Sequence, residues 1–320
     1  MKRCFVRWLC VTLATLIVPL CMKSAIPPDR PATPRPTPTD AQREETDTVR
    51  LLLSDSGETL TLSLRDYVAG ATAAEMPVSF DRQALCAQAL ASLTYALYRQ
   101  AHPPESQPDG TPLTDDPAEC QAFWTVEEMR ERWGDDFEEN YDKILSAVDE
   151  VIGYEITYEE EPAAAAFHAV SPGRTESAEN VWGDEIPYLI SVESEGDSVS
   201  PKFRSALTVN AKEFGAKLGL ETEDPPEEWL GDTEYTEAGT LLAVQIGGKT
   251  FTGQELRRIF DLQSAAFTVS FDGTAFTFDV KGWGHGVGLS QYGADYLARH
   301  GMTWREIIAH YYPGTEIVER

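Results

Sequence analysis

Basic residues are scarce in this chain, and their shortage excludes one class of partner. Lysine and arginine together number 26 against 53 aspartates and glutamates, which gives a formal net charge of -27 at neutral pH. Binding to nucleic acid depends on positive surface that neutralises phosphates, so we expect no nucleic-acid partner. The acidic excess itself mainly favours solubility.

Cysteine is also scarce in the part of the chain that follows the N-terminal apolar run. The chain has five cysteines, and only Cys86 and Cys120 lie beyond the N-terminal apolar run. Two cysteines do not form the framework that stabilises small disulfide-rich domains. Cys86 lies in an apolar segment, where a free thiol behaves as a small hydrophobic group. We therefore expect no bridge between them, although an extracytoplasmic location would permit one.

The N-terminus has the features of a membrane anchor. Lys2, Arg3 and Arg7 flank an apolar run of about fifteen residues, Trp8 to Met22. Counted from Cys4, with Arg7 reaching back to the interface, the run contains about nineteen residues, which is enough to cross a membrane. The positive flank would stay inside and the rest of the chain outside.

A cleaved signal peptide is the alternative to an anchor. No A-x-A site follows the run, and Val18-Pro19-Leu20-Cys21 is a poor lipoprotein signal, which favours an uncleaved anchor. Proline, threonine and charge then dominate the next segment and favour an extended chain. We therefore predict a cytoplasmic tip and transmembrane anchor over 1–23, a Pro/Thr-rich linker over 24–48, and an extracytoplasmic domain over 49–320. The protein would be a single-pass protein of the cell membrane.

The order of the predicted elements in that domain favours a mixed α+β fold with mostly antiparallel strands. One helix, from Phe80 to Tyr98 with Ser79 as its cap, is apolar almost all round and should be buried. The other predicted helices are 126–150, 205–220 and 252–260, an acidic loop is expected at 223–234, and strands are expected at 49–64 (a pair), 154–158, 164–169, 188–192, 241–246, 267–271 and 276–280.

Glu75 is a single carboxylate within a run of small and apolar residues. Nothing between Gly70 and Met76 offers it a charge partner, so burial would disfavour its ionised form and raise its pKa. A raised pKa makes a carboxyl group a general acid at neutral pH. A structural role as a helix cap or in an ion pair explains a lone glutamate equally well and stays open from this segment alone.

A glycine-rich stretch, KGWGHGVGLSQYGA, occupies Lys281 to Ala294. Glycines permit backbone conformations closed to other residues and a close approach of another group to the main chain. The stretch lacks the Lys-Ser/Thr ending of a phosphate-binding loop. Trp283 and Tyr292 offer flat amphipathic rings on which sugars stack. His285 fits either a binding residue or a satisfied loop histidine.

Three stretches together, AAEMP at Ala73–Pro77, FHAVSPGRTESAENVWG at Phe167–Gly183 and GWGHGVGLSQYGA, resemble the stage II sporulation protein D family, which includes amidase-enhancer proteins. The resemblance extends from about Leu51 to the C-terminus. It implies a lytic transglycosylase that cleaves peptidoglycan glycan strands lacking stem peptides during forespore engulfment, together with a cell-wall amidase of the engulfment machinery as a partner. The catalytic glutamate of the family corresponds to Glu75, and its groove residues correspond to Gln121, Ser171, Tyr188, His285 and Gln291.

Two departures from the family pattern concern metal and charge. Some members bind zinc through a histidine and two cysteines, whereas here Cys120 occupies one position and Thr114 the other. One thiol with a distant His102 does not make a tetrahedral site, so we expect no metal and no cofactor. Members usually carry arginine where this chain has Leu93 and often lysine where it has Ile190.

The loss of these two cations leaves several alternatives. The enzyme would be slower, would prefer another substrate, or would use Arg174 or another basic residue instead. A different class of function is a non-catalytic wall-binding module that enhances an N-acetylmuramoyl-L-alanine amidase. The intact Glu75 favours the enzyme, and the two losses favour the enhancer. A purely structural, membrane-tethered scaffold leaves the glycine-rich stretch unexplained.

Overall fold

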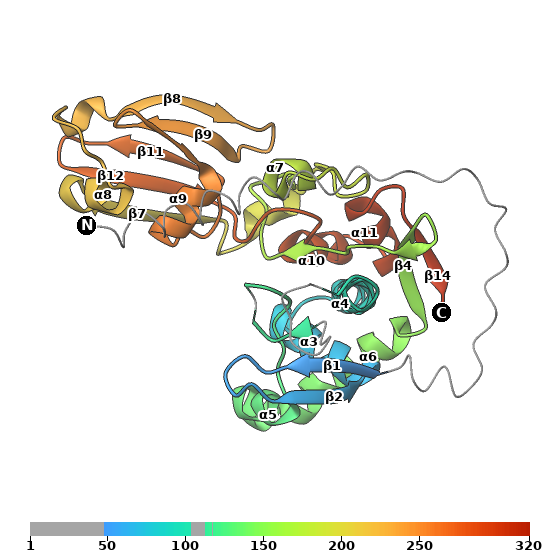
Figure 1. The fold of residues 1–320 in the computed structure, drawn as a ribbon. Helices are drawn as coiled ribbons and strands as arrows, with labels where there is room; N and C mark the ends of the chain where they lie inside the picture. Colours follow the sequence, from blue (N-terminus) through green and yellow to red (C-terminus); the bar gives the residue numbers. More distant parts are fainter. Residues whose placement is uncertain (1–47, 104–112, 117) are drawn as a thin grey trace, which may run out of the picture. The chain divides into compact units, whose positions relative to one another are not determined.

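The computed structural model of the chain describes residues 48–103, 113–116 and 118–320, which belong to one compact unit (Figure 1). The predicted anchor and nearly all of the predicted linker lie outside the described residues. Within the described ranges, no helix combines the length and the apolar character needed to cross a membrane.

The described residues form a mixed α+β structure, as the sequence predicts. Their paired strands are antiparallel apart from β1 (Thr48–Leu52) with β3 (Leu113–Thr114) and β6 (Phe167–His168) with β13 (Leu289–Ser290). The β6–β13 pair joins two segments far apart in the sequence, and it carries much of the site described below.

Helix α4 (Arg82–Ala101) is the centre of the first hydrophobic core, and its buried residues run almost all round, as predicted. The predicted start was too early, because the cap is Asp81, whose side chain accepts a hydrogen bond from the Gln83 amide. The helices packed around it are α3 (Leu64–Glu75), α6 (Phe137–Val151), α10 (Gln291–Arg299) and α11 (Trp304–Tyr311) (Figure 1).

Strands border this first core at two places. The predicted strand pair at 49–64 is present as β1 and β2 (Thr59–Ser63), and Ser63 then caps α3 by accepting from the Asp66 amide. The second border is a small sheet in the order β14 (Glu316–Glu319), β4 (Tyr154–Tyr158) and β5 (Glu161–Pro162). The C-terminal strand β14 thus pairs with a strand from the middle of the chain.

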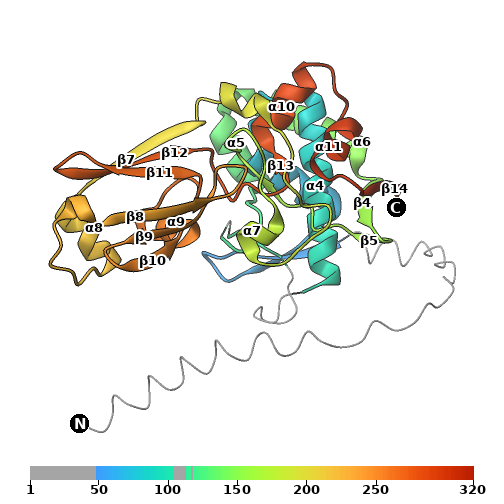
Figure 2. The same cartoon turned by 90° about the horizontal axis from the view of Figure 1, so that it is seen from above.

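A second hydrophobic core is enclosed by two three-stranded sheets. Its centre is a cluster of aromatic rings in which Phe214 stacks on Phe276 at 3.9 Å between ring centroids. Figure 2 shows these strands gathered away from α4, α10 and α11. One sheet has the order β11 (Phe267–Phe271), β12 (Ala275–Lys281), β7 (Arg204–Asn210), the other has β10 (Lys249–Thr252), β9 (Leu241–Ile246), β8 (Leu230–Tyr235), and the helices are α8 (Ala211–Leu218) and α9 (Gly253–Phe260).

Several predicted elements of this second region differ from the observed ones. The predicted helix 205–220 is strand β7 followed by α8, because β7 pairs along its whole length with β12 and only α8 is helical. The predicted acidic loop at 223–234 contains most of β8, whose exposed acidic residues occupy a sheet edge. In both cases strand pairing overrides local preference, for β7 with the distant β12 and for β8 with the adjacent β9.

Other predicted boundaries were wrong in the first region. The predicted helix 126–150 is broken into α5 (Val126–Trp133) and α6 at Gly134, whose φ of 54° ends the first helix. Only β6 forms within the predicted strand 164–169. The predicted strand 188–192 is irregular and follows the short helix α7 (Ala178–Trp182).

Candidate active site

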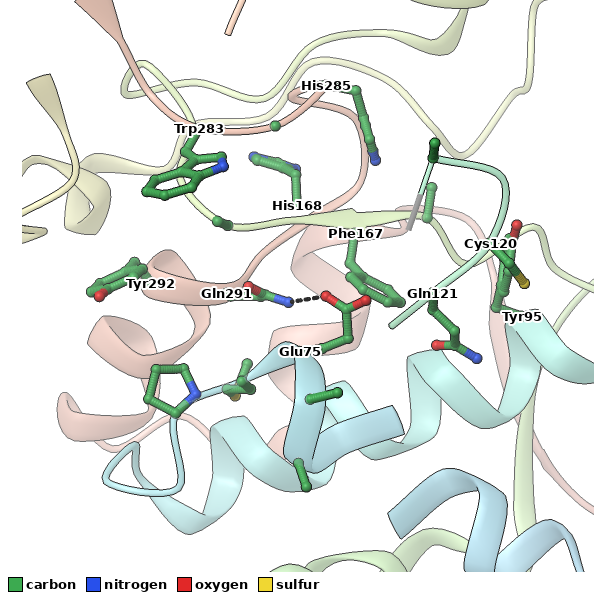
Figure 3. Close-up of a pocket in the computed structure, with 18 of the residues that line it drawn as sticks. Glu75, Tyr95, Cys120, Gln121, Phe167, His168, Trp283, His285, Gln291 and Tyr292 are labelled. Atoms are coloured by element: carbon green, nitrogen blue, oxygen red, sulfur yellow. Dashed lines mark hydrogen bonds between the residues drawn. The ribbon is translucent and has the colours of Figure 1, made fainter. Parts of the chain in front are cut away.

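A cavity of about 820 Å³ opens beside the C-terminal end of α3. Most of its walls come from four separate parts of the chain: residues 73–78, residues 118–124, the segment around β6, and residues 283–292. The remaining lining residues are Tyr95, Tyr98, Trp133, Trp182, Ile186, Lys202 and Arg257. Figure 3 shows Glu75 in the middle of these walls, with Gln291 reaching it from α10. The volume is in the range of about 300–1,000 Å³ typical of ligand sites.

Glu75 is the last residue of α3, because Met76 is already extended and Pro77 follows. The side chain is half-buried and held at both oxygens. The Ala122 backbone N–H donates to Oε1 at 2.6 Å, and Gln291 Nε2 donates to Oε2 at 3.4 Å. Burial raises the pKa of Glu75, and these two hydrogen bonds oppose the rise. The predicted direction is therefore confirmed.

The ion-pair alternative for Glu75 is not seen among the described residues, whose ion pairs do not include it. The carboxyl group instead lines the cavity while its neighbours hold its orientation. A carboxyl group that is desolvated, oriented and open to a cavity can donate a proton to a bound ligand.

Two predicted groove residues, Gln121 and Gln291, line the cavity with Glu75. Gln291 is the first residue of α10, and its Nε2 lies 3.4 Å from Gln88 Oε1 as well as near Glu75. Gln121 Nε2 donates to Tyr67 Oη at 2.8 Å, and its Oε1 is buried without a hydrogen-bond partner. Gln121 thus contributes to the wall with one buried acceptor that has no hydrogen-bond partner.

His285, also predicted, lines the cavity beside a second histidine that sequence reasoning missed, His168. The rings lie 5.8 Å apart between centroids. Val287 connects them, because its N–H donates to His285 Nδ1 at 3.0 Å and its carbonyl oxygen lies 3.1 Å from His168 Nδ1. Burial lowers the pKa of His168 to about 3 and that of His285 to about 4, so both rings are neutral at pH 7.

Aromatic side chains provide the apolar part of the cavity wall. Trp283 and Tyr292, both singled out in the sequence, line it, and Trp283 is 39% exposed. Trp182, which sequence reasoning missed, is 46% exposed and lies beside His285, with 5.3 Å between the ring centroids and the rings tilted by 50°. Exposed aromatic faces around a cavity are suited to sugar rings.

The glycines of the 281–294 stretch serve contacts between chain segments. Gly288 has a φ of +71°, and a Cβ there would lie 2.0 Å from the carbonyl oxygen of Ala166. Gly284 has a φ of +108°, and a Cβ there would lie 2.8 Å from the Cβ of His168. Because only glycine fits both conformations, these positions let β13 pack directly on the β6 segment and place His285 and Gln291 in the cavity.

Ser171 and Tyr188, the remaining predicted groove residues, lie outside the residues that line the cavity. The Tyr188 hydroxyl accepts a hydrogen bond from the Ala164 N–H at 2.7 Å, and Ala164 is itself a cavity residue. Ser171 is fully buried and donates from Oγ to Asp197 Oδ2 at 2.5 Å. Both side chains therefore support the walls rather than face the space between them.

Asp197 is a buried carboxylate that no sequence signal distinguished from its acidic surroundings. Its Oδ1 accepts from Ser290 Oγ at 2.5 Å, and its Oδ2 accepts from both the N–H and Oγ of Ser171. Burial raises the pKa of Asp197, and these hydrogen bonds oppose the rise. Since Ser290 caps α10 immediately before Gln291, Asp197 ties the start of that helix to the Ser171 turn.

The positions that depart from the family pattern do not line the cavity. Leu93 is fully buried in the first core, and Ile190 is 44% exposed. Arg174, the alternative cation, pairs with Glu193 at 3.6 Å and also lies outside the lining. Neither Leu93 nor Ile190 therefore contributes a side chain to the cavity wall in this chain.

The residues at the family's zinc positions, together with His102, lie in different surroundings. Cys120 is half-buried, packs against the first core and is a free thiol, as is Cys86. Thr114 is buried in β3, and His102 is exposed at the end of α4, where its ring stacks on Tyr98. Across the described ranges, no group of three or more histidine, cysteine or acidic residues is placed to hold a metal ion.

Comparison with known proteins shows the family to which the chain is similar. The family model described as "Stage II sporulation protein" matches residues 55–158. Stage II sporulation protein D of Bacillus amyloliquefaciens is 38% identical over 259 residues, which cover 81% of this chain and 75% of that protein. The chain belongs to the stage II sporulation protein D family. The Bacillus subtilis member is 37% identical over 260 residues, covering 81% of this chain and 75% of its own.

A more distant relative connects the stage II sporulation protein D family with amidases. The "Amidase enhancer" of Bacillus subtilis is 25% identical over 300 residues, which cover 76% of this chain and 39% of that protein. The family match itself contains Glu75 and Gln121, whereas His285 and Gln291 lie beyond it.

Proposed function

We propose that this chain is a lytic transglycosylase that cleaves peptidoglycan glycan strands lacking stem peptides during sporulation. The observation that carries the proposal is the position of Glu75, a carboxyl group of raised pKa at the centre of an aromatic-lined cavity. Hydrolytic glycosidases generally pair two carboxylates across the scissile bond. Among the described residues, the only other carboxylate in the lining is that of Glu119, which is exposed.

One carboxylic acid is sufficient when the substrate supplies its own nucleophile. Glu75 protonates the glycosidic oxygen as its bond to the anomeric carbon of the muramyl residue breaks. The 6-hydroxyl of the same residue attacks that carbon, forms the new C–O bond and gives its proton to the Glu75 carboxylate. No water is consumed, Glu75 returns to its protonated form, and the product ends in a 1,6-anhydro-muramyl residue. The intramolecular attack supplies much of the rate.

The cavity residues divide the remaining tasks. Ala122 N–H and Gln291 hold the two oxygens of Glu75, so that its proton is presented in one direction. The neutral histidines, His168 and His285, add no positive charge beside the developing oxocarbenium ion. Trp283 and Tyr292 provide stacking surfaces for the sugars on either side of the bond.

The second candidate function is that of a wall-binding protein that enhances an amidase without cutting glycan. The similarity to the amidase enhancer and the apolar residues at positions 93 and 190 favour it. For either function we propose that the chain is held at the cell membrane through residues 1–23, with the domain on the extracytoplasmic side. An amidase of the engulfment machinery, which strips peptides from the strands, would be its partner.

Mass spectrometry of glycan strands separates the two candidates. Strands treated with amidase are incubated with the purified full-length chain in mild detergent, and the ends of the products are identified. Anhydro-muramyl ends that increase with enzyme concentration support the transglycosylase. Reducing muramyl ends would instead indicate hydrolysis, and intact strands with a measurable rise in amidase activity would indicate the enhancer.

A further inference from the structure

Two cations line the cavity, and the sequence pattern singled out neither of them. They are Lys202 and Arg257. Both belong to the part of the chain that builds the second core, Arg257 on α9 and Lys202 just before β7. The cavity is thus closed on this side by a region outside the residues matched by the family model.

Arg257 is held in place by its own helix. Thr252 caps α9 in a capping box with Glu255, and Leu256 and Phe260 bury the opposite face of the helix in the second core. The side chain is half-buried, and its Nε donates to the Leu262 carbonyl oxygen at 3.3 Å. This bond uses one of the five donors of the guanidinium, and the fork formed by the two terminal nitrogens remains.

No carboxylate pairs with Arg257 or Lys202 among the described ion pairs. Burial lowers the pKa of Arg257, with Asp261 opposing the effect, and its charge contributes to lowering the pKa of both His168 and His285. The guanidinium is therefore near the histidine side of the cavity. A desolvated cation without a partner is unfavourable unless a ligand supplies the negative charge.

Lys202 extends the positive charge along the same wall. Its Nζ lies 4.2 Å from the centre of the Trp283 ring, a cation–π contact at the exposed aromatic face of the cavity. In a chain with a formal net charge of -27, one cavity is lined by two cations that no ion pair of the described residues includes. They indicate that the bound ligand is an anion.

We propose that Arg257, assisted by Lys202, binds the lactyl carboxylate of a muramyl residue and thereby selects strands from which the stem peptide has been removed. The assignment rests on the proposed glycan substrate. In a strand that carries its peptide, the lactyl group is an amide and bears no charge at this position. Removal of the peptide exposes a carboxylate, the group that an arginine fork binds with two parallel hydrogen bonds. One side chain thus distinguishes the two forms of the same sugar.

The test measures binding in the absence of cleavage. The full-length chain carrying Glu75→Gln is titrated calorimetrically with two tetrasaccharide probes of alternating N-acetylglucosamine and N-acetylmuramic acid. One probe has free lactyl carboxylates, and the other has them converted to N-methylamides. We expect the free carboxylate probe to bind at least about tenfold more tightly, because a charge-assisted bidentate pair is lost in the amide.

Adding Arg257→Gln should reduce this preference to less than about threefold while leaving affinity for the amide probe unchanged. Lys202→Gln should reduce it by a smaller factor, because Lys202 is exposed. The matched control is Arg258→Gln, an exposed arginine next along α9 and outside the cavity lining, which should keep the full preference. A preference that survives Arg257→Gln overturns the proposal.

A folding failure of Arg257→Gln, seen in its circular dichroism melt, would move the test to Arg257→Lys. Lysine keeps the charge but loses the fork, so the preference must still fall by at least about threefold, and an unchanged preference overturns the proposal. The result is independent of catalysis. If wild-type protein leaves strands uncut while the preference follows Arg257, the proposed reaction fails and this assignment stands. If wild-type protein cleaves the strands but the two probes bind equally well, the proposed reaction stands and the assignment of Arg257 fails.

Discussion

Glu75 and Gln291 lie 216 positions apart in the chain, and the Gln291 amide nitrogen is 3.4 Å from a Glu75 carboxyl oxygen. The contact joins the end of α3 to the start of α10, so the orientation of the Glu75 side chain depends on two segments that are distant in the sequence. Because an amide donor stabilises the ionised carboxylate, Gln291 tunes the acid as well as orienting it.

Gln291→Leu should therefore raise the pKa of Glu75 modestly, because a hydrogen bond to the ionised carboxylate is lost but that bond is long. The protonated acid then persists to higher pH, and the alkaline limb of the pH profile for glycan cleavage shifts upward. Gln245→Leu, an exposed glutamine on β9, serves as the control and should leave the profile in place. A shift of the limb to lower pH would contradict the assigned role of Gln291.

Glu75→Gln should remove cleavage while leaving the fold intact, because glutamine keeps the volume and the acceptor for the Ala122 amide but cannot donate the acidic proton. A lost general acid typically costs about a hundredfold or more in rate. Burial raises the pKa of Glu75, so its contribution to stability is present below the unfolded pKa and lost as pH rises through the folded one. The melting temperature of the variant at pH 7 should thus equal or exceed that of wild type. Cleavage at a tenth of the wild-type rate would remove Glu75 from its proposed role.

His168 should make stability depend on pH below neutrality. Its pKa falls from an ordinary 6.5 to about 3 in the folded chain. Between these two pH values the unfolded state binds a proton at His168 and the folded state does not. Stability is then complete above about pH 6.5 and is lost as pH falls, by about 1.4 kcal/mol per pH unit for each such histidine. His168→Gln should lower the slope by that amount in urea unfolding between about pH 6 and pH 4.

The exposed His300 provides the control for this measurement, since His300→Gln should leave the slope as in wild type. His285 has its pKa lowered to about 4 and should add a second contribution over the same window. A slope that is equal in wild type and His168→Gln would show that the ring is not kept neutral by the fold.

Asp197→Ala should lower the free energy of unfolding by about 3 kcal/mol, because the Ser171 amide and the hydroxyls of Ser171 and Ser290 lose a buried acceptor. Asp197→Asn retains an acceptor and should cost less. Since Ser290 precedes Gln291, the alanine variant should also lower kcat more than it changes KM. Denaturant unfolding and steady-state cleavage rates measure both effects, and an alanine variant as stable as wild type would contradict the role of Asp197.

The parts of this molecule that follow from local sequence were predictable. The all-round apolar pattern of α4 predicts its burial, and the small apolar surroundings of Glu75 predict the raised pKa. Strand β7 was mistaken for helix because its partner β12 begins about seventy residues later, and a single stretch does not contain that information. Pairing at a distance decides such cases.

The composition of the site was predictable only where a motif marked it. Gln121, His285 and Gln291 were found, whereas His168 and Asp197 were not, although His168 stands within the FHAVSPGRTESAENVWG stretch. Nothing in the chain near Arg257 indicates that it reaches the cavity. Its position depends on how the second core packs, which is a property of many contacts rather than of a motif.

The packing of α10 on α4 has a consequence for the folding of the chain during its synthesis. Gln88 on α4 and Gln291 on α10 are 203 positions apart. At about 5–20 residues per second, roughly 10 to 40 s of synthesis separate α4 from α10, whereas α3 and α6, which also pack on α4, are made earlier. During that interval the side of α4 that α10 covers is exposed and Glu75 lacks its Gln291 contact, so a chain ended at residue 288 should aggregate, which a sedimentation assay measures. Because Gln291 lies near the C-terminus, Glu75 gains this hydrogen bond only when nearly all of the protein has been synthesised.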